Sequence, residues 1–317
     1  MKRKWHSSVK RFLIGIIFLS MTVALAACGS AEPAFSGQQG KMKVTTTIGM
    51  IADIVKEVGG DSVEVVGLMK SGVDPHYYKA SQGDIKKLEQ ADIIFYNGLH
   101  LEGKMVDIFE KMTKSKPTVA VSKNIPENKL RNADDGTAGH DPHIWFDVRH
   151  WMTATETVRD ALIENDKVNA DKYRANTASY LKKLEELHEY AKKEIAAIPE
   201  KSRVLVTAHD AFGYFGAAYG LKVMGLQGIS TASEAGTKDT NQLRDFLVDN
   251  KIKAVFVESS VSPKAINAVI EGAKKKDHTV TIGGELFSDA MGKEGTTEGT
   301  YIGMVRHNVD TIIKALK

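Results

Sequence analysis

The chain contains a single cysteine among its 317 residues, and that residue, Cys28, lies close to the N-terminus. A lone cysteine cannot form an intramolecular disulfide, and it cannot supply the paired thiolates of a typical structural metal site. The fold must therefore be stabilised by an ordinary hydrophobic core.

The sequence also lacks an excess of charge of one sign. Five of its 43 basic residues precede Phe12, so 38 basic residues stand against 40 acidic residues in the rest of the chain. A net charge near −2 offers no basic surface to a polyanion. We therefore expect no nucleic-acid partner.

Three common catalytic signatures are missing as well. The chain has no His-Glu-x-x-His motif, no Gly-x-Ser-x-Gly nucleophile elbow and no P-loop. A metal-dependent hydrolase is the alternative to a binding protein, but such an enzyme requires an open coordination position for water and a positioned base. The sequence favours a binding protein over an enzyme.

The N-terminus reads as a lipoprotein signal peptide that covers residues 1–27. A basic start precedes the apolar run 12–27, and the run ends in Leu25-Ala26-Ala27-Cys28, which resembles the lipobox of bacterial lipoproteins. Cys28 is therefore predicted to carry the lipid that anchors the chain to the membrane. An uncleaved anchor and a plain secreted protein are the alternatives. Residues 28–42 are small and polar, which predicts a flexible tether.

From Lys43 onwards, short β-branched runs alternate with helical segments, and this order predicts parallel α/β architecture. The expected strands are 44–48, 63–68, 92–96, 118–121, 204–207, 222–226, 254–258 and 279–282. The expected helices, apart from one long segment, are 50–58, 81–90, 102–114, 151–165, 212–219, 241–250, 263–275 and 301–316.

The long segment 168–198 has no glycine or proline, and its apolar residues recur at helical spacing among Lys and Glu. One amphipathic helix of about 45 Å is the simplest interpretation, and a coiled-coil strand is the alternative. We predict two α/β lobes, 43–166 and 199–317, each a parallel sheet flanked by helices, joined by a linking helix at 167–198.

One short motif occurs twice, as Asp74-Pro75-His76 and as Asp141-Pro142-His143. In each copy the proline fixes its own φ and pushes the preceding aspartate into an extended conformation. Each histidine is thereby presented from a stiff corner. A single copy would be an ordinary turn, and the repetition favours a function.

Ligands of parallel α/β sheets gather outside the carboxyl ends of the strands. The metal-binding side chains expected there are His76, His143, His209 and Asp289, two from each lobe. Three imidazoles and one carboxylate suit a divalent first-row metal. His140 is an alternative to His143. Asp147 and Glu258 are candidate acceptors that would orient a ligand imidazole, although a surface or core role is equally open for both.

Further motifs extend the pattern along the chain: Thr207-Ala208-His209-Asp210-Ala211-Phe212-Gly213-Tyr214-Phe215, Val257-Glu258-Ser259-Ser260 and Ser288-Asp289-Ala290-Met291. Together with the lipobox, the paired Asp-Pro-His loops and the long helix, they resemble the cluster A-I solute-binding lipoproteins of manganese and zinc ABC transporters. The resemblance covers essentially the whole mature chain and is greatest to the manganese-binding lipoproteins of Gram-positive bacteria.

The resemblance implies a monomeric receptor held by lipid on Cys28 at the extracytoplasmic face of the cell membrane. It implies that the receptor captures one metal ion between its lobes and delivers it to an ABC permease driven by an ATPase. By motif position His76, His143, His209 and Asp289 would be the four ligands. The rigid linking helix of the family implies small lobe movements.

The choice of metal depends on two opposed observations. Some manganese receptors of the family carry glutamate where this chain has His209, and imidazole in place of oxygen shifts a site towards zinc. Dedicated zinc receptors often carry a histidine-rich acidic loop, whereas loop 124–140 holds one histidine, His140, and few acidic residues, among them Asp134 and Asp135. Similarity over the whole chain favours Mn²⁺, with Zn²⁺ as the alternative. A surface adhesin is a third hypothesis, suggested only by names given to such lipoproteins.

Overall fold

The N-terminal lobe is built on a four-stranded parallel sheet with the strand order β2-β1-β3-β4. The computed structural model describes residues 35–36, 40–133 and 139–317, so the predicted signal peptide and Cys28 lie outside the described residues. The strands are β1 (Met42–Thr46), β2 (Val63–Gly67), β3 (Ile93–Tyr96) and β4 (Thr118–Ala120). Because every pair is parallel, the carboxyl ends of all four strands meet at one edge of the sheet.

The folded part begins inside the segment predicted to be the tether. Phe35 is only 5% exposed, and Met42 already pairs with Val63 in the sheet. The apolar side chain of Phe35 explains this, because burying it against the lobe is more favourable than leaving it in water.

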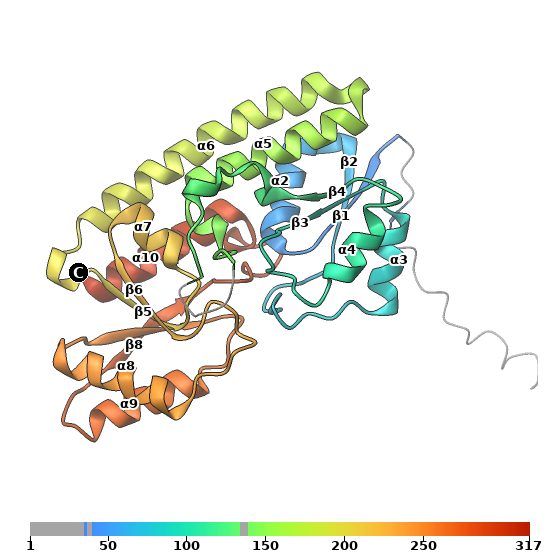
Figure 1. Ribbon diagram of the computed structural model, residues 1–317. Coiled ribbons are helices and arrows are strands. Elements are labelled where there is room, and N and C mark those ends of the chain that lie inside the picture. Colours follow the sequence, from blue (N-terminus) through green and yellow to red (C-terminus); the bar gives the residue numbers. More distant parts are fainter. Residues whose placement is uncertain (1–34, 37–39, 134–138) are drawn as a thin grey trace, which may run out of the picture. The chain divides into compact units, whose positions relative to one another are not determined.

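Helices cover both faces of this sheet. Figure 1 shows α3 and α4 on one face and α2 and α5 on the other. Their bounds are α2 (Gly49–Gly59), α3 (Gln82–Gln90), α4 (Val106–Met112) and α5 (Val148–Asn165). Ser81 caps α3, since its hydroxyl accepts a hydrogen bond from the backbone N–H of Asp84.

The helix expected at 102–114 is shorter than predicted, because the chain first makes a left-handed turn. Gly98, Leu99 and His100 all have positive φ, at 85°, 53° and 61°. The buried carboxylate of Glu102 accepts hydrogen bonds from the Asn97 backbone N–H (2.7 Å) and the Thr47 hydroxyl (2.6 Å). The turn conformation continues through Lys104, so α4 starts only at Val106.

The C-terminal lobe has two parallel strand pairs, β5 with β6 and β7 with β8, and β5 and β7 lie next to each other. The strands are β5 (Val204–His209), β6 (Lys222–Gln227), β7 (Ala254–Glu258) and β8 (Thr281–Leu286). Their helices are α7 (Gly213–Tyr219), α8 (Thr237–Asp249), α9 (Lys264–Lys274) and α10 (Tyr301–Leu316). Residues such as Val206, Val255 and Ile266 form the core beneath α8 and α9.

The last strand was predicted to end at residue 282, but β8 continues through Gly283 and Gly284 to Leu286. Glycine serves close packing here: a Cβ on Gly283 would lie 2.8 Å from Cβ of Ala315 and 2.9 Å from the ring of Phe256. A glycine pair that suggested a strand end instead lets a helix and a neighbouring side chain approach the strand.

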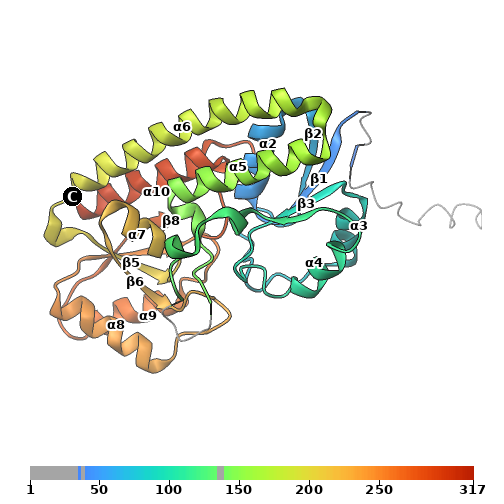
Figure 2. The same ribbon diagram turned by 45° about the horizontal axis from the view of Figure 1, so that its top comes forward.

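The predicted linking helix is confirmed as α6 (Ala170–Ala196), which follows a 3₁₀ turn at Lys167–Asn169. It is about 40 Å long and runs beside α5, α2 and α10, from one lobe to the other (Figures 1 and 2). Its buried stripe, which includes Tyr180, Leu184 and Leu187, packs inside the chain. That packing leaves no apolar seam on α6 for the coiled-coil alternative.

Two helices start earlier than predicted. The helix expected from residue 151 starts at Val148, where Asp147 accepts a hydrogen bond from the Arg149 N–H, and the helix expected from 241 starts at Thr237.

Among the described residues, none of the helices combines the length and the apolar character that crossing a membrane requires.

Candidate metal centre

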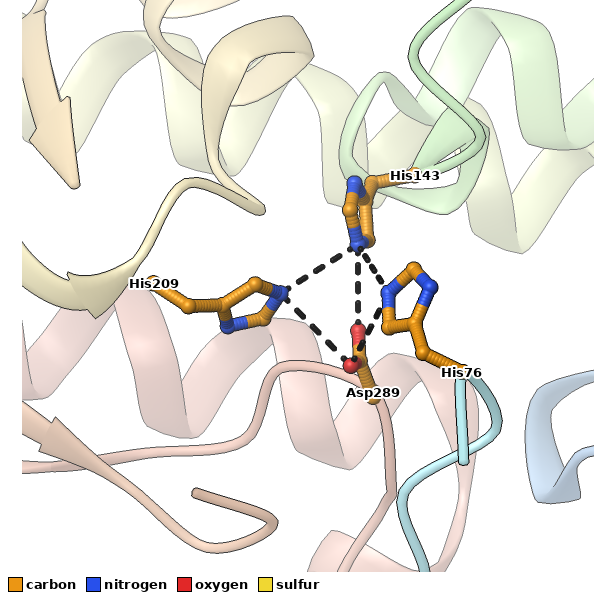
Figure 3. A group of neighbouring side chains, drawn as sticks. All are labelled: His76, His143, His209 and Asp289. Carbon is orange, nitrogen blue, oxygen red and sulfur yellow. Dashed lines mark hydrogen bonds and ion pairs between the residues drawn. The ribbon is translucent and has the colours of Figure 1, made fainter. Parts of the chain in front are cut away.

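Four side chains from four separate loops or strand ends converge in the interior between the lobes (Figure 3). They are His76, His143, His209 and Asp289, and one ligand atom of each lies within 4.8 Å of the others. None of them is more than 4% exposed. The structure thus brings together the set that the strand-end argument selected.

His76 lies in the loop that follows β2. The Asp74 carboxylate accepts a hydrogen bond from the His76 backbone N–H at 2.9 Å, which closes the Asp-Pro-His corner. Beyond His76, the hydroxyl of Tyr78 donates to Asp84 at 2.8 Å and ties the loop to the start of α3. The imidazole therefore projects from a fixed corner.

His143 lies directly before a 3₁₀ turn, Ile144–Phe146. Asp141 Oδ1 accepts from the His143 backbone N–H (3.0 Å) and lies 2.8 Å from the Nδ1 of its ring. A carboxylate only accepts hydrogen bonds, so Nδ1 donates to Asp141 and Nε2 is the nitrogen that faces the cluster. The carbonyl oxygen of Pro142 accepts from the amide of Asn97 at 2.9 Å, which fixes the backbone of this corner.

His209 is the last residue of β5. Its Nδ1 lies 2.5 Å from Glu258 Oε2, and Glu258 Oε1 accepts from its backbone N–H at 2.8 Å. Glu258 ends β7, so neighbouring strands place the ring and its acceptor side by side. Here too the proton on Nδ1 leaves Nε2 free to face the cluster.

Asp289 follows β8, and the buried Asn308 of α10 holds the backbone two residues before it. The Asn308 side chain accepts from the Phe287 N–H (2.9 Å) and donates to the Phe287 carbonyl (2.7 Å). Both carboxylate oxygens of Asp289 are buried, and neither has a hydrogen-bond partner among the described residues. Buried carboxylate oxygens that lack a hydrogen-bond donor can be stabilised by a bound cation.

The spacing of the ligand atoms matches a small first-row cation. The Nε2 of His143 lies 3.4 Å from the Nε2 of both His76 and His209, and 3.3 Å from Asp289 Oδ1. Asp289 Oδ2 lies 3.5 Å from the Nε2 of His76 and 3.6 Å from that of His209. Gaps of 3.3–3.6 Å between these atoms are comparable to those between ligands that bind one divalent metal at about 2.0–2.2 Å.

The charges of the cluster are strongly coupled. Burial lowers the pKa of His76 to about 3, against the attraction of Asp289. Burial also acts to lower the pKa of His143, but the hydrogen bond to Asp141 and the negative charges of Asp141 and Asp289 outweigh it and raise the pKa to about 10. The pKa of Asp289 is held far below its usual range, because the attraction of His209 and His143 outweighs the effect of burial. Without a metal, a proton therefore stays on His143.

Two other sequence candidates lie elsewhere. His140 pairs with Glu127 at 2.8 Å and is not among the converging residues. Asp147 caps α5 and contacts none of the three cluster imidazoles, whereas Glu258 orients His209 as anticipated. Sequence reasoning missed Asp141 as the acceptor for His143. Its place two residues before the histidine, in the same motif, was the available signal.

Two parallel-sheet lobes, a long helix between them and a closed cluster of three imidazoles and a carboxylate define the class of solute-binding proteins that enclose their ligand between lobes. Residues 44–315 match the family described as zinc-uptake complex component A, periplasmic. The chain belongs to this family, whose members are solute-binding proteins for metal transport and not enzymes. The sequence-based family assignment and the expectation of a non-enzyme are confirmed.

Individual relatives cover nearly the whole chain. The manganese-binding lipoprotein MntA of Bacillus subtilis is 54% identical over 94% of this chain and 97% of its own length. The zinc-binding protein TroA of Treponema pallidum is 47% identical over 92% of each, and its solved structure superposes with a TM-score of 0.85 over 87% of this chain and 99% of that one. The metal ABC transporter substrate-binding lipoprotein FimA of Streptococcus parasanguinis is 33% identical over 95% of this chain and 96% of its own.

Proposed function

We propose that His76, His143, His209 and Asp289 bind one Mn²⁺ ion as transported cargo, which the chain delivers to an ABC permease and its ATPase for import. The observation that carries the proposal is the convergence of imidazole Nε2 atoms on two buried carboxylate oxygens that have no hydrogen-bond donor. With Nδ1 of His143 and His209 bonded to carboxylates, the Nε2 atom of each ring is the one placed to bind a metal.

The relatives support Mn²⁺ as the metal that the cluster binds, and Zn²⁺ is the second candidate. The relative with 54% identity is a manganese-binding lipoprotein. Both oxygens of Asp289 face the imidazoles, so the carboxylate can supply a fifth ligand atom, which suits the larger Mn²⁺. Zinc is the second candidate, because three imidazoles and one carboxylate can supply the four ligand atoms that it prefers and the 47% identical relative is a zinc-binding protein.

The anchoring of the chain is part of the same proposal. Cys28 carries lipid, residues 1–27 are removed as the signal peptide, and the tether holds a monomeric receptor on the extracytoplasmic face of the cell membrane. The support is the Leu25-Ala26-Ala27-Cys28 motif together with the relatives named as lipoproteins.

Elemental analysis tests the ligand set. The full chain, purified in detergent without added metal, is offered equal and limiting Mn²⁺ and Zn²⁺. We expect one equivalent of metal in the wild type and in His140→Ala, and none in His143→Ala. His140→Ala is the matched control, because this imidazole bonds Glu127 outside the cluster. Stoichiometric metal in His143→Ala would refute the ligand assignment.

Uptake in cells identifies the transported ion, because N/O sites hold Zn²⁺ more tightly than Mn²⁺ whatever the cell imports. We expect deletion of the gene to abolish Mn²⁺ uptake and the wild-type chain to restore it. Loss of Zn²⁺ uptake with normal Mn²⁺ uptake would instead establish the zinc receptor.

A further inference from the structure

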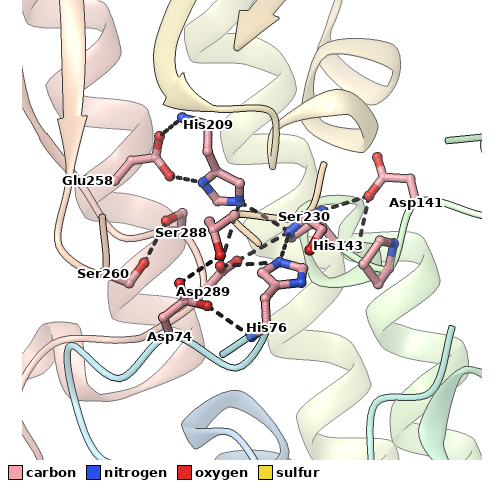
Figure 4. Close-up of polar contacts among 12 residues, drawn as sticks. Asp74, His76, Asp141, His143, His209, Ser230, Glu258, Ser260, Ser288 and Asp289 are labelled. Carbon is pink, nitrogen blue, oxygen red and sulfur yellow. Dashed lines mark hydrogen bonds and ion pairs between the residues drawn. The ribbon is translucent and has the colours of Figure 1, made fainter. Parts of the chain in front are cut away.

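The first Asp-Pro-His corner is bonded to the opposite lobe, and the second corner uses its aspartate differently. Asp74 Oδ1 accepts from the His76 N–H, while Asp74 Oδ2 accepts from the hydroxyl of Thr231 at 2.7 Å. Thr231 belongs to the C-terminal lobe, in the loop between β6 and α8, and is 3% exposed. Figure 4 shows Asp74 beside His76 and Asp289, where the two lobes meet. One carboxylate thus joins the backbone of a metal-site residue to the other lobe.

The second corner has stronger links to the C-terminal lobe. Beside it, the indole N–H of Trp145 donates to the Ser288 carbonyl at 3.0 Å, and the hydroxyl of Tyr214 donates to the Asp141 carbonyl at 3.0 Å. All four residues are buried. His143 is therefore fixed to the C-terminal lobe by two buried hydrogen bonds that do not depend on its own aspartate carboxylate.

The loop of His76 has a more exposed attachment. Apart from the Thr231 bond, its cross-lobe hydrogen bond among the described residues runs from the exposed Ser71 hydroxyl to the Met291 carbonyl at 2.8 Å. Tyr77, next to His76, is 48% exposed. The buried hydroxyl of Thr231 is thus the main polar restraint that keeps this corner against the other lobe.

We infer that Thr231 is a positioning residue, a latch that holds the His76 corner closed through Asp74 and thereby sets how long the metal is retained. When the corner moves away, the Thr231 hydroxyl and the Asp74 carboxylate separate, and one ligand leaves with them. The bond therefore opposes metal release and touches neither the metal nor its ligand atoms. This inference rests on the proposed function of the cluster.

Dissociation of Mn²⁺ tests the latch. The loaded full chain is mixed with excess EDTA, and protein-bound Mn²⁺ is measured over time. We expect Thr231→Val, which keeps the shape and removes the hydroxyl, to release Mn²⁺ about 10-fold faster, as for the loss of one hydrogen bond to a charged group. Thr231→Ser should restore the slow rate, and every variant should still bind one equivalent.

Two further variants separate a latch from a general loss of stability. In Asp74→Asn, Oδ1 still accepts from His76, while a neutral amide replaces Oδ2, so any remaining hydrogen bond to Thr231 no longer involves a charged group. The effects of Asp74→Asn and Thr231→Val on the rate of Mn²⁺ release should therefore not add in the double variant. Thr240→Val is the matched control, since that hydroxyl bonds Gly236 within its own lobe, and it should leave the rate unchanged. The melting temperature of metal-free Thr231→Val should equal that of the wild type.

The outcomes distinguish the latch from the proposal that the cluster binds a transported metal ion. A wild-type rate in Thr231→Val with one bound Mn²⁺ overturns the latch and leaves the metal receptor intact. Additive effects of the two variants also overturn it. Absence of stoichiometric metal in the wild type overturns the proposed function itself.

Discussion

Asp289 is the one cluster residue that brings a negative charge, and nothing among the described residues neutralises that charge except the neighbouring imidazoles. Asp289→Asn keeps the volume and removes the charge. We expect Mn²⁺ affinity to fall by about 100-fold or more, since a buried charge is lost from the first coordination sphere. The far-ultraviolet circular dichroism of the metal-free variant should be unchanged.

A competition titration against a chelator of known affinity measures the loss. Asp210→Asn is the control, because Asp210 follows His209 directly but is not among the converging residues. Near-normal affinity in Asp289→Asn would show that the metal lies elsewhere.

The proton on His143 makes metal binding depend on pH. The neighbouring carboxylates of Asp141 and Asp289 raise the pKa of His143 to about 10 in the metal-free protein, despite the opposite effect of burial. Bound metal needs the Nε2 lone pair, so Mn²⁺ must displace this proton even at neutral pH. We therefore expect apparent affinity to keep rising with pH from 6 to 9, beyond about 6.5, the pKa of an ordinary histidine.

Calorimetry in buffers of different ionisation enthalpy counts the protons released. About one proton per Mn²⁺ at pH 7.5 is the expected result. Binding without proton release at that pH would mean that His143 is neutral before the metal arrives.

At the scale of elements, three helices meet at Asp53 of α2. Its carboxylate accepts from the Tyr301 N–H at the start of α10 (3.1 Å) and from the hydroxyl of Tyr180 on α6 (3.3 Å). Burial raises its pKa from 3.8 to about 6, against these two hydrogen bonds. The folded protein thus holds a proton here more tightly than the unfolded chain does.

The sign of the pH effect follows from this raised pKa. The stability that protonated Asp53 contributes is fully present below pH 3.8 and is lost as pH rises through about 6. Asp53→Asn can keep both hydrogen bonds and does not titrate. We expect its free energy of unfolding to gain on that of the wild type as pH rises from 4 to 7. Urea unfolding at several pH values measures the difference, and a constant difference would contradict the raised pKa.

The helices and strands also show how much of the fold could be predicted from the sequence. Alternating periodicity revealed the strands, the helices and the linking helix, because each buries one face and its pattern is local. The start of α4 and the end of β8 could not be read in this way. The first depends on Glu102 folding back onto Asn97, and the second on Gly283 packing against Phe256 and Ala315. Neither contact can be recognised from the spacing of apolar residues along the chain.

The convergence of the four side chains was predicted more fully than the element boundaries. Histidines and an aspartate at the carboxyl ends of parallel strands meet at the same edge, so topology narrows the choice to His76, His143 or His140, His209 and Asp289. The acceptor of each imidazole proton was harder to predict, since that pairing depends on side-chain direction. Asp141 and Asp147 are equally plausible by sequence, and only the turn geometry at His143 separates them.

At the scale of the whole folded unit, α6 limits how far the lobes can separate. It packs on α2 and α5 of the N-terminal lobe and on α10 of the C-terminal lobe, so wide opening would expose its buried side chains. We expect metal binding to slow amide hydrogen exchange in the loops that carry the four cluster residues and in the Thr231 loop, and to leave exchange along α6 unchanged. Mass spectrometry of the full chain with and without Mn²⁺ measures this, and a large change along α6 would indicate a wider closure.

The fluorescence of Trp145 offers an optical signal of metal binding. Its ring lies edge-on to His143 with centroids 5.3 Å apart, and its N–H is bonded across the lobes to Ser288, the residue before Asp289. A paramagnetic ion held by those neighbours lies within quenching range of the indole. The emission of Trp145 should therefore fall as Mn²⁺ occupies the site, and Trp145→Phe should remove most of that change. The protein would then report its own loading without any attached dye.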